Sequence, residues 1–245
     1  MREGYAVGSF YGYKVDHVYR NQAEIDADNA AAVAAGHAKY NNGSATAPGD
    51  LKFKDINKDG FLDEKDRTIL GDGFPNLNYG LTLTANYKNW DILVYGYGVA
   101  GSRIYSYSAM TLTDMFPSDN GTTPNILNEV AQNAWTPTHT DAQYARLSFL
   151  DLNYNMRGSD AWVKKGDYFK ISNIQIGYTF DKKLLKVIHI ESLRLNASVQ
   201  NVLCISSYNK YGDPEAGQGS VLYTGLDTGR YPMPRIYSLG LNIQF

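Results

Sequence analysis

The chain has 245 residues, with 23 Lys+Arg against 25 Asp+Glu, and its formal net charge is −2. This balance argues against a nucleic-acid-binding protein, which normally carries a basic excess. Hydrophobic residues make up 43% of the chain, so the bulk of it is not disordered. A single cysteine, Cys204, excludes an internal disulfide framework and a cysteine-based zinc site.

Tyrosine and glycine are abundant, with 20 Tyr and 23 Gly, and both favour twisted strands and tight turns over helical bundles. The sequence contains no run of 18 apolar residues, which excludes a membrane-spanning helix. A mean hydropathy of −0.38 still permits membrane strands, because such strands alternate apolar and polar residues.

In chain order, residues 1–20 predict a strand that opens abruptly, and residues 21–40 predict one or two short helices. A Gly/Ser/Ala/Pro linker covers 41–49, and an acidic loop covers 50–72. The region 81–99 predicts a hairpin that turns at Lys88 and Asn89.

Three more strands are predicted at 168–180, 193–201 and 236–245 by alternation of apolar and polar residues. Two long irregular stretches, 101–160 and 204–233, separate the strands. Loops of such length are usually functional or disordered.

Regular alternation fits either a soluble sandwich or a barrel in lipid. Two features favour the barrel: short turns alternate with very long loops, and one strand face carries polar residues that suit a water-filled lumen. These polar residues are Arg194, Asn196, Gln200, Asn242 and Gln244. The last strand ends in the aromatic residue Phe245, which resembles the signal read by the outer-membrane barrel assembly machinery.

The acidic loop has the spacing of a twelve-residue calcium-binding loop. Side-chain oxygens stand at positions 1, 3, 5, 9 and 12, Gly60 stands at position 6, and position 7 offers its backbone carbonyl. The predicted metal ligands are Asp55, Asn57, Asp59, Phe61, Asp63 and Asp66. We expect a structural Ca²⁺, with Mg²⁺ able to compete because Asp66 is shorter than the usual Glu. The alternative is an Asx-rich surface turn without metal.

No nucleophile elbow, P-loop or dinucleotide-binding motif occurs, and the four histidines lack metal-ligand spacing. We therefore expect a protein that is not an enzyme and has no catalytic residues.

Several stretches resemble the C-terminal part of SusC/RagA-family TonB-dependent transporters of Bacteroidetes-type outer membranes. The stretches are EGYAVGSFYGYK at 3–14, GDLKFKDINKDGFLDEKDRTILGDGFPNLNYGLTL at 49–83, AWTP at 134–137, GDYFKISNIQIGYTF at 166–180, SLRLNASVQNVL at 192–203, YGDPE at 211–215 and YPMPRIYSLGLNIQF at 231–245. They follow the family's order and cover most of the chain outside the long loops.

The resemblance implies an all-β fold: residues 1–245 would be the antiparallel C-terminal segment of a 22-stranded transmembrane barrel with long extracellular loops, and would supply about six to eight strands. It implies a cell outer membrane location, with the strands facing lipid, and import of glycans, oligosaccharides or peptides. A SusD-like lipoprotein would close over the loops 101–160 and 204–233 as a lid.

Nothing in the sequence resembles the family's plug domain, TonB box or N-terminal signal. Contact with TonB would therefore be made through that missing N-terminal part, and we expect Met1 to mark either an artificial boundary or a truncated reading frame. A partial sheet cannot close, so the isolated chain is not expected to transport anything. The competing hypothesis is a soluble, calcium-binding β-sandwich that binds carbohydrate.

Overall fold

The computed structural model describes residues 4–41, 45–113, 125–215 and 220–245, and the chain divides into two compact units. We call one the sheet unit, and it comprises Phe74–Ser102, Lys165–Glu215 and Arg230–Phe245. The other, the loop unit, comprises Met1–Gly73, Arg103–Lys164 and Ala216–Gly229.

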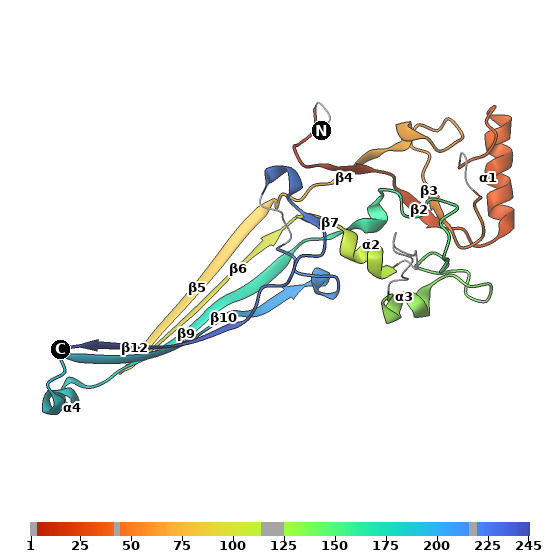
Figure 1. Ribbon diagram of the computed structural model, residues 1–245. Helices are drawn as coiled ribbons and strands as arrows, with labels where there is room; N and C mark the ends of the chain where they lie inside the picture. The colour runs from red at the N-terminus through yellow and green to blue at the C-terminus, as the bar shows by residue number, and fades with distance from the viewer. Residues whose placement is uncertain (1–3, 42–44, 114–124, 216–219) are drawn as a thin grey trace. The chain divides into compact units, whose positions relative to one another are not determined.

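The sheet unit is built on one antiparallel sheet of five strands that run side by side (Figure 1). Its strands are β5 (Leu77–Tyr87), β6 (Trp90–Ala100), β9 (Tyr168–Thr179), β10 (Ser192–Ser206) and β12 (Ile236–Gln244). They pair in chain order, so the sheet is a simple meander. These strands confirm the hairpin and the three later strands expected from the alternation, although five strands are fewer than the expected six to eight.

The pairing register collects the apolar residues on one face of the sheet. One row across all five strands consists of Leu83, Val94, Ile174, Val199 and Tyr237. A polar row on the opposite face consists of Asn86, Asp91, Gly177, Asn196 and Gly240. The apolar face is open to its surroundings, because Leu83 is 56% exposed and Tyr237 is 71% exposed.

Strand β9 keeps its apolar residues on that face only because its pairing is irregular. Ile174 and Ile176 have even numbers, whereas Phe169 and Ile171 have odd numbers, so a regular strand would place the two pairs on opposite faces. The register with β6 shifts between Tyr95 and Gly96, where one extra residue of β9 is accommodated. This bulge returns Phe169 and Ile171 to the apolar face.

The connections differ sharply between the two ends of the sheet. At one end, residues 88–89 join β5 to β6, and residues 180–191 join β9 to β10. The latter carry α4 (Lys182–Leu185) and the 3₁₀ turn η3 (Lys186–Ile188). At the other end, residues 101–167 follow β6 and residues 207–235 follow β10. The expected alternation of short turns with long loops is thus confirmed.

Short elements make up the remainder of the chain. The helices are α1 (Gln22–Ala34), α2 (Tyr107–Thr113) and α3 (Asn128–Asn133), and the 3₁₀ turns are η1 (Glu64–Asp66), η2 (Asp160–Trp162), η4 (Ser207–Lys210) and η5 (Val221–Tyr223). The short strands are β1 (Phe10–Gly12), β2 (Val15–Val18), β3 (Leu51–Phe53), β4 (Thr68–Gly71), β7 (Arg103–Ser106), β8 (Val163–Lys165) and β11 (Leu226–Asp227). Every helix among the described residues is too short or too polar to cross a lipid bilayer.

The single strand expected over residues 1–20 is wrong. Two short strands, β1 and β2, form instead, and they belong to different two-stranded sheets: β1 pairs with β4, and β2 pairs with β3. Glycine interrupts the alternation, and Gly8, with a positive φ of 79°, lies in a turn directly before β1.

The loop unit has a small apolar core, which consists of Tyr13, Val18, Leu51, Phe53 and Leu62. A buried polar network supplements it around Asp50, whose side chain is 1% exposed. Asp50 accepts hydrogen bonds from Arg146 Nε at 2.8 Å and Asn155 Nδ2 at 3.1 Å. Asn153 donates to the Leu51 carbonyl at 2.9 Å and accepts from Thr46 at 2.6 Å. Segments far apart in the sequence are therefore joined by side-chain amides and carboxylates.

Candidate functional site

The polar face of the five-stranded sheet carries an ion pair that spans β9. Arg194 Nη2 on β10 lies 2.6 Å from Asp91 Oδ2 on β6. The backbone of Gly177 lies between them, and a Cβ there would come within 2.5 Å of Asp91 Oδ1 and 2.7 Å of Arg194 Nη2. Gly177 thus leaves room for the pair, and the charged groups stay on the face opposite to the apolar residues.

A second charged cluster lies on the same face, near the end of the sheet with the long connections. Lys170 on β9 is only 4% exposed and forms an ion pair with Glu215. Glu215 also accepts hydrogen bonds from the hydroxyls of Tyr97 and Tyr168. A buried ammonium is costly without a counterion, so this carboxylate compensates Lys170.

The acidic loop folds around its own backbone N–H groups. Asp55 accepts from the N–H of Lys58 at 2.6 Å and from that of Gly60 at 2.8 Å. Asp66 is fully buried and accepts from the N–H groups of Ile56 and Asp63, both at 2.8 Å. Burial raises the pKa of Asp66, although these hydrogen bonds act in the opposite direction.

Among the described residues, no group of three or more His, Cys, Asp or Glu side chains is arranged to hold a metal ion. Asn57, Asp59 and Asp63 also bond within the loop: Asn57 Nδ2 donates to Asp59 at 2.7 Å, and Asp63 accepts from the N–H of Lys65 at 2.7 Å. The predicted ligands lie between β3 and the end of η1, and calcium binding there stays a prediction.

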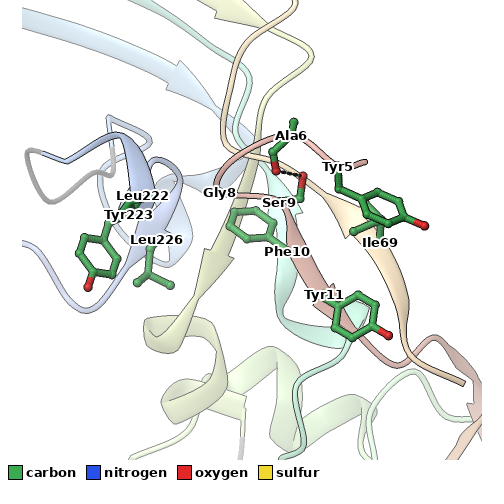
Figure 2. A pocket seen from close by; sticks show the side chains of 10 residues that line it. All are labelled: Tyr5, Ala6, Gly8, Ser9, Phe10, Tyr11, Ile69, Leu222, Tyr223 and Leu226. Atoms are coloured by element: carbon green, nitrogen blue, oxygen red, sulfur yellow. Dashed lines mark hydrogen bonds between the residues drawn. The ribbon is translucent and has the colours of Figure 1, made fainter. Parts of the chain in front are cut away.

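An open cleft of about 600 Å³ lies within the loop unit (Figure 2). Its lining consists of Tyr5, Ala6, Gly8, Ser9, Phe10, Tyr11, Ile69, Leu222, Tyr223 and Leu226. None of these residues is charged, and the hydroxyl of Ser9 is used locally on the carbonyl of Ala6 at 2.8 Å. The cleft can therefore accept an uncharged group with an apolar surface.

Comparison with known proteins identifies the class. The chain is 30% identical to TonB-dependent receptor P3 of Formosa agariphila over 256 aligned residues, which cover 100% of this chain and 23% of that receptor. It is 28% identical to TonB-dependent receptor SusC of Bacteroides thetaiotaomicron, over 99% of this chain and 20% of that receptor. The chain is homologous to part of a SusC-type TonB-dependent receptor. No protein-family model matches the sequence.

Solved structures agree with this receptor fold. The structure of the RagAB peptide transporter matches 97% of the chain and 23% of its own with a TM-score of 0.67 and 16% identity. The 'closed-closed' state of the RagAB peptide importer matches equally, with a TM-score of 0.67. The chain therefore shares the fold of the corresponding part of these structures. The chain spans about a quarter of the length of these relatives, with 23% of receptor P3 covered.

These relatives are receptors and transporters, which confirms the expectation of a protein that is not an enzyme. The soluble β-sandwich alternative loses its support, because 99% or more of the chain aligns with part of TonB-dependent receptors.

Sequence reasoning missed the Lys170–Glu215 cluster. The stretch YGDPE that contains Glu215 was noticed only for its resemblance, and no local pattern connects Glu215 with a lysine on β9. One available signal was the polar lysine between Phe169 and Ile171 in an otherwise apolar stretch.

Proposed function

We propose that this chain forms part of the wall of a TonB-dependent outer-membrane importer, with its apolar face toward lipid and its polar face toward the lumen. The observation that carries the proposal is the continuous, exposed apolar face across five strands. In water such a face would be an aggregation hazard, whereas in a bilayer it faces hydrocarbon. Strands of 9 to 15 residues are long enough to cross a membrane when tilted.

A pair of adjacent substitutions on β12 tests the orientation. Leu239 is 77% exposed on the apolar face, and its neighbour Ser238 lies on the polar face opposite Ser198. We expect Leu239→Arg to abolish assembly, because arginine facing mid-membrane lipid costs about 2–4 kcal/mol. Ser238→Arg is the control and is expected to assemble normally. The readout is a heat-modifiable band in the outer-membrane fraction, and equal behaviour of both variants would refute the proposal.

The imported substrate is proposed to be a glycan, an oligosaccharide or a peptide. A SusD-like lipoprotein is the proposed partner, and TonB is proposed to supply the energy for import. The names of the relatives support this class, since one is SusC and another is a peptide importer. The loops 101–160 and 204–233 are the proposed contact surface for the lipoprotein, although residues 114–124 and 216–219 lie outside the described residues. Uptake of labelled oligosaccharides and peptides by cells with and without the protein would test the proposal and separate the substrates.

We propose that the barrel assembly machinery recognises the strand that ends at Phe245. Phe245 is 83% exposed and follows directly after β12. Replacing Phe245 by serine should reduce the amount of assembled protein, while the adjacent change Gln244→Ser should not. Equal amounts of both variants in the outer membrane would contradict this role.

We further propose that the loop 50–72 takes up Ca²⁺ through Asp55, Asn57, Asp59, Phe61, Asp63 and Asp66. Supporting it are the spacing and the glycine at the sharp turn, Gly60, whose φ is 94°. Calorimetric titration should show calcium binding that is lost in Asp59→Asn and retained in Asp141→Asn, a carboxylate outside the loop. If titration of the wild-type protein with calcium released no heat of binding, the loop would be an Asx-rich surface turn without metal.

A further inference from the structure

The side chain of Glu215 attaches the connection between β10 and β12 to the polar face of the sheet. Glu215 accepts hydrogen bonds from three donors: Lys170 Nζ, the Tyr97 hydroxyl and, at 3.4 Å, the Tyr168 hydroxyl. Lys170 and Tyr168 lie on β9, and Tyr97 lies on β6, where it is paired with Lys170. The sheet therefore presents one cation and two hydroxyls to a single carboxylate.

The connection is also braced internally on both sides of Glu215. Asp213 accepts from the N–H of Glu215 at 3.0 Å and from that of Met233 at 3.4 Å. Arg230 Nη1 donates to the Glu215 carbonyl at 3.3 Å. Tyr208 in η4 is fully buried. The turn 207–215 is thus held together by its own hydrogen bonds, and Glu215 links it to the strands through a charged side chain.

Beside this attachment is an open cavity of about 310 Å³ within the sheet unit. Its lining consists of Lys170, Asn201, Leu203, Cys204, Asn209, Gly212, Asp213, Pro232 and Met233. Cys204 on β10 is directly paired with Lys170 on β9. The chain's one thiol therefore lies next to the attachment and reports on access to it.

The negative charge of Glu215 makes its contact with Lys170 energetically important. Lys170 is nearly inaccessible, and a buried ammonium that loses its partner keeps its full desolvation cost. Among the described residues, Glu215 is the carboxylate paired with Lys170. Hydrogen bonds to a charged group are stronger than neutral ones, so the three donors together favour one position of the turn.

We infer that Glu215 is a positioning residue that fastens the turn 207–215 onto the polar face of the sheet, where this turn limits access to the half-buried Cys204. The turn is then a fixed part of the lumen lining and is withdrawn from the proposed contact surface for the lipoprotein. The lumen and the lipoprotein contact rest on the proposed function, whereas the attachment of the turn to the sheet does not.

The test is the rate at which Cys204 reacts with a water-soluble maleimide in the native, assembled protein, followed by mass spectrometry of its peptide. We expect Glu215→Gln to raise this rate at least tenfold, because the neutral amide cannot compensate Lys170. Glu191→Gln, which changes an exposed carboxylate at the opposite end of the sheet, is the control and should leave the rate unchanged.

A second readout separates release of the turn from altered thiol reactivity. Hydrogen exchange of residues 207–215 should become faster in Glu215→Gln, and Lys170→Met should produce the same change while the band remains heat-modifiable. Unchanged labelling and exchange in assembled Glu215→Gln would overturn the inference. A wild-type Cys204 that reacts as fast as in the denatured protein would overturn it too. Recovery of the protein in the soluble fraction would instead sink the proposed function, and the labelling contrast could still be measured there.

Discussion

Individual buried polar residues, rather than a large apolar core, stabilise the fold of the loop unit. Asp50 is 1% exposed and binds Arg146, whose side chain is 28% exposed. Asn153 is likewise 1% exposed and bonds to four neighbouring groups. Because a buried polar group without partners is expensive, each of these side chains is required by the others.

Removing Asp50 should therefore be costly. We expect Asp50→Ala to destabilise the loop unit by about 3 kcal/mol, because Arg146 is left without its carboxylate. The exposed pair between Arg20 and Asp141 offers a comparison, since the Asp141 side chain is 91% exposed. Asp141→Ala should have no measurable effect. Hydrogen exchange of β2 and β3 would compare the two, and equal protection in both variants would show that the buried network is dispensable.

The stability of the loop unit should also fall at alkaline pH. Burial raises the pKa of Tyr19, helped by its hydrogen bond to Asp28, and burial likewise raises the pKa of Tyr40. Burial raises the pKa of Tyr105 to about 12. Unfolded tyrosine ionises near pH ~10. The folded state holds these protons longer, so its advantage is full below that pH and is lost as pH rises through the folded pKa.

Tyrosinate absorbance measured together with circular dichroism checks this expectation. Some of the tyrosines should ionise only when the circular dichroism signal shows that the protein unfolds. Tyr19→Phe should reduce the tyrosinate absorbance that appears at that point. The matched change Tyr231→Phe alters a side chain that is 85% exposed and should not affect it. Complete tyrosine ionisation before any structural change would contradict the role of burial.

At the scale of the strands, two aromatic rings lie over glycines. The Tyr79 and Phe169 rings stack with centroids 6.1 Å apart. A Cβ on Gly98 would come within 2.3 Å of the Tyr168 carbonyl and 2.6 Å of the Tyr79 ring, and one on Gly96 would come within 2.8 Å of the Phe169 ring. The rings cover the gaps left by missing side chains, which ties β5, β6 and β9 together.

Gly98→Ala should consequently destabilise the sheet by about 1–3 kcal/mol, because the backbone carbonyl cannot move aside cheaply. Gly80→Ala in the neighbouring strand is the control, since its nearest atom would be 3.7 Å away. Urea unfolding in detergent would measure both. Equal stabilities would mean that the sheet flattens to admit the methyl group.

Alternation predicted most of these strands because each carries one apolar face. It located β9 correctly at 168–180 but did not reveal the extra residue there, which reverses the numbering of apolar positions between Ile171 and Ile174. The helix expected in 21–40 is confirmed as α1, whose first turn is capped by Asn21. The attachment by Glu215 escaped prediction, since it joins residues 45 positions apart through side chains alone.

At the scale of the whole molecule, the proposed function assigns the two ends of the sheet to opposite sides of the membrane. Long connections of outer-membrane barrels face the outside, and short turns face the periplasm. The hairpin in which Thr136 and His139 pair belongs to a long connection, whereas Lys186 belongs to a short one.

Epitope insertions should report these sides directly. A tag after Thr138 should be labelled by antibody on intact cells, and a tag after Lys186 only after permeabilisation. Labelling of the Lys186 tag on intact cells would reverse the orientation, and labelling of neither tag would place both on the inner side.

The bulge in β9 has a consequence for how such genes can diverge. β12 pairs residue by residue with residues 192–200 of β10, so losing one codon within either of these stretches would turn the following side chains to the wrong face. β9 tolerates one extra residue between Asn173 and Ile171 because its apolar residues shift from even to odd positions across that point, which keeps them on one face. Natural insertions and deletions should therefore accumulate between strands, and a length change within a strand should come with a matching reversal of its apolar pattern.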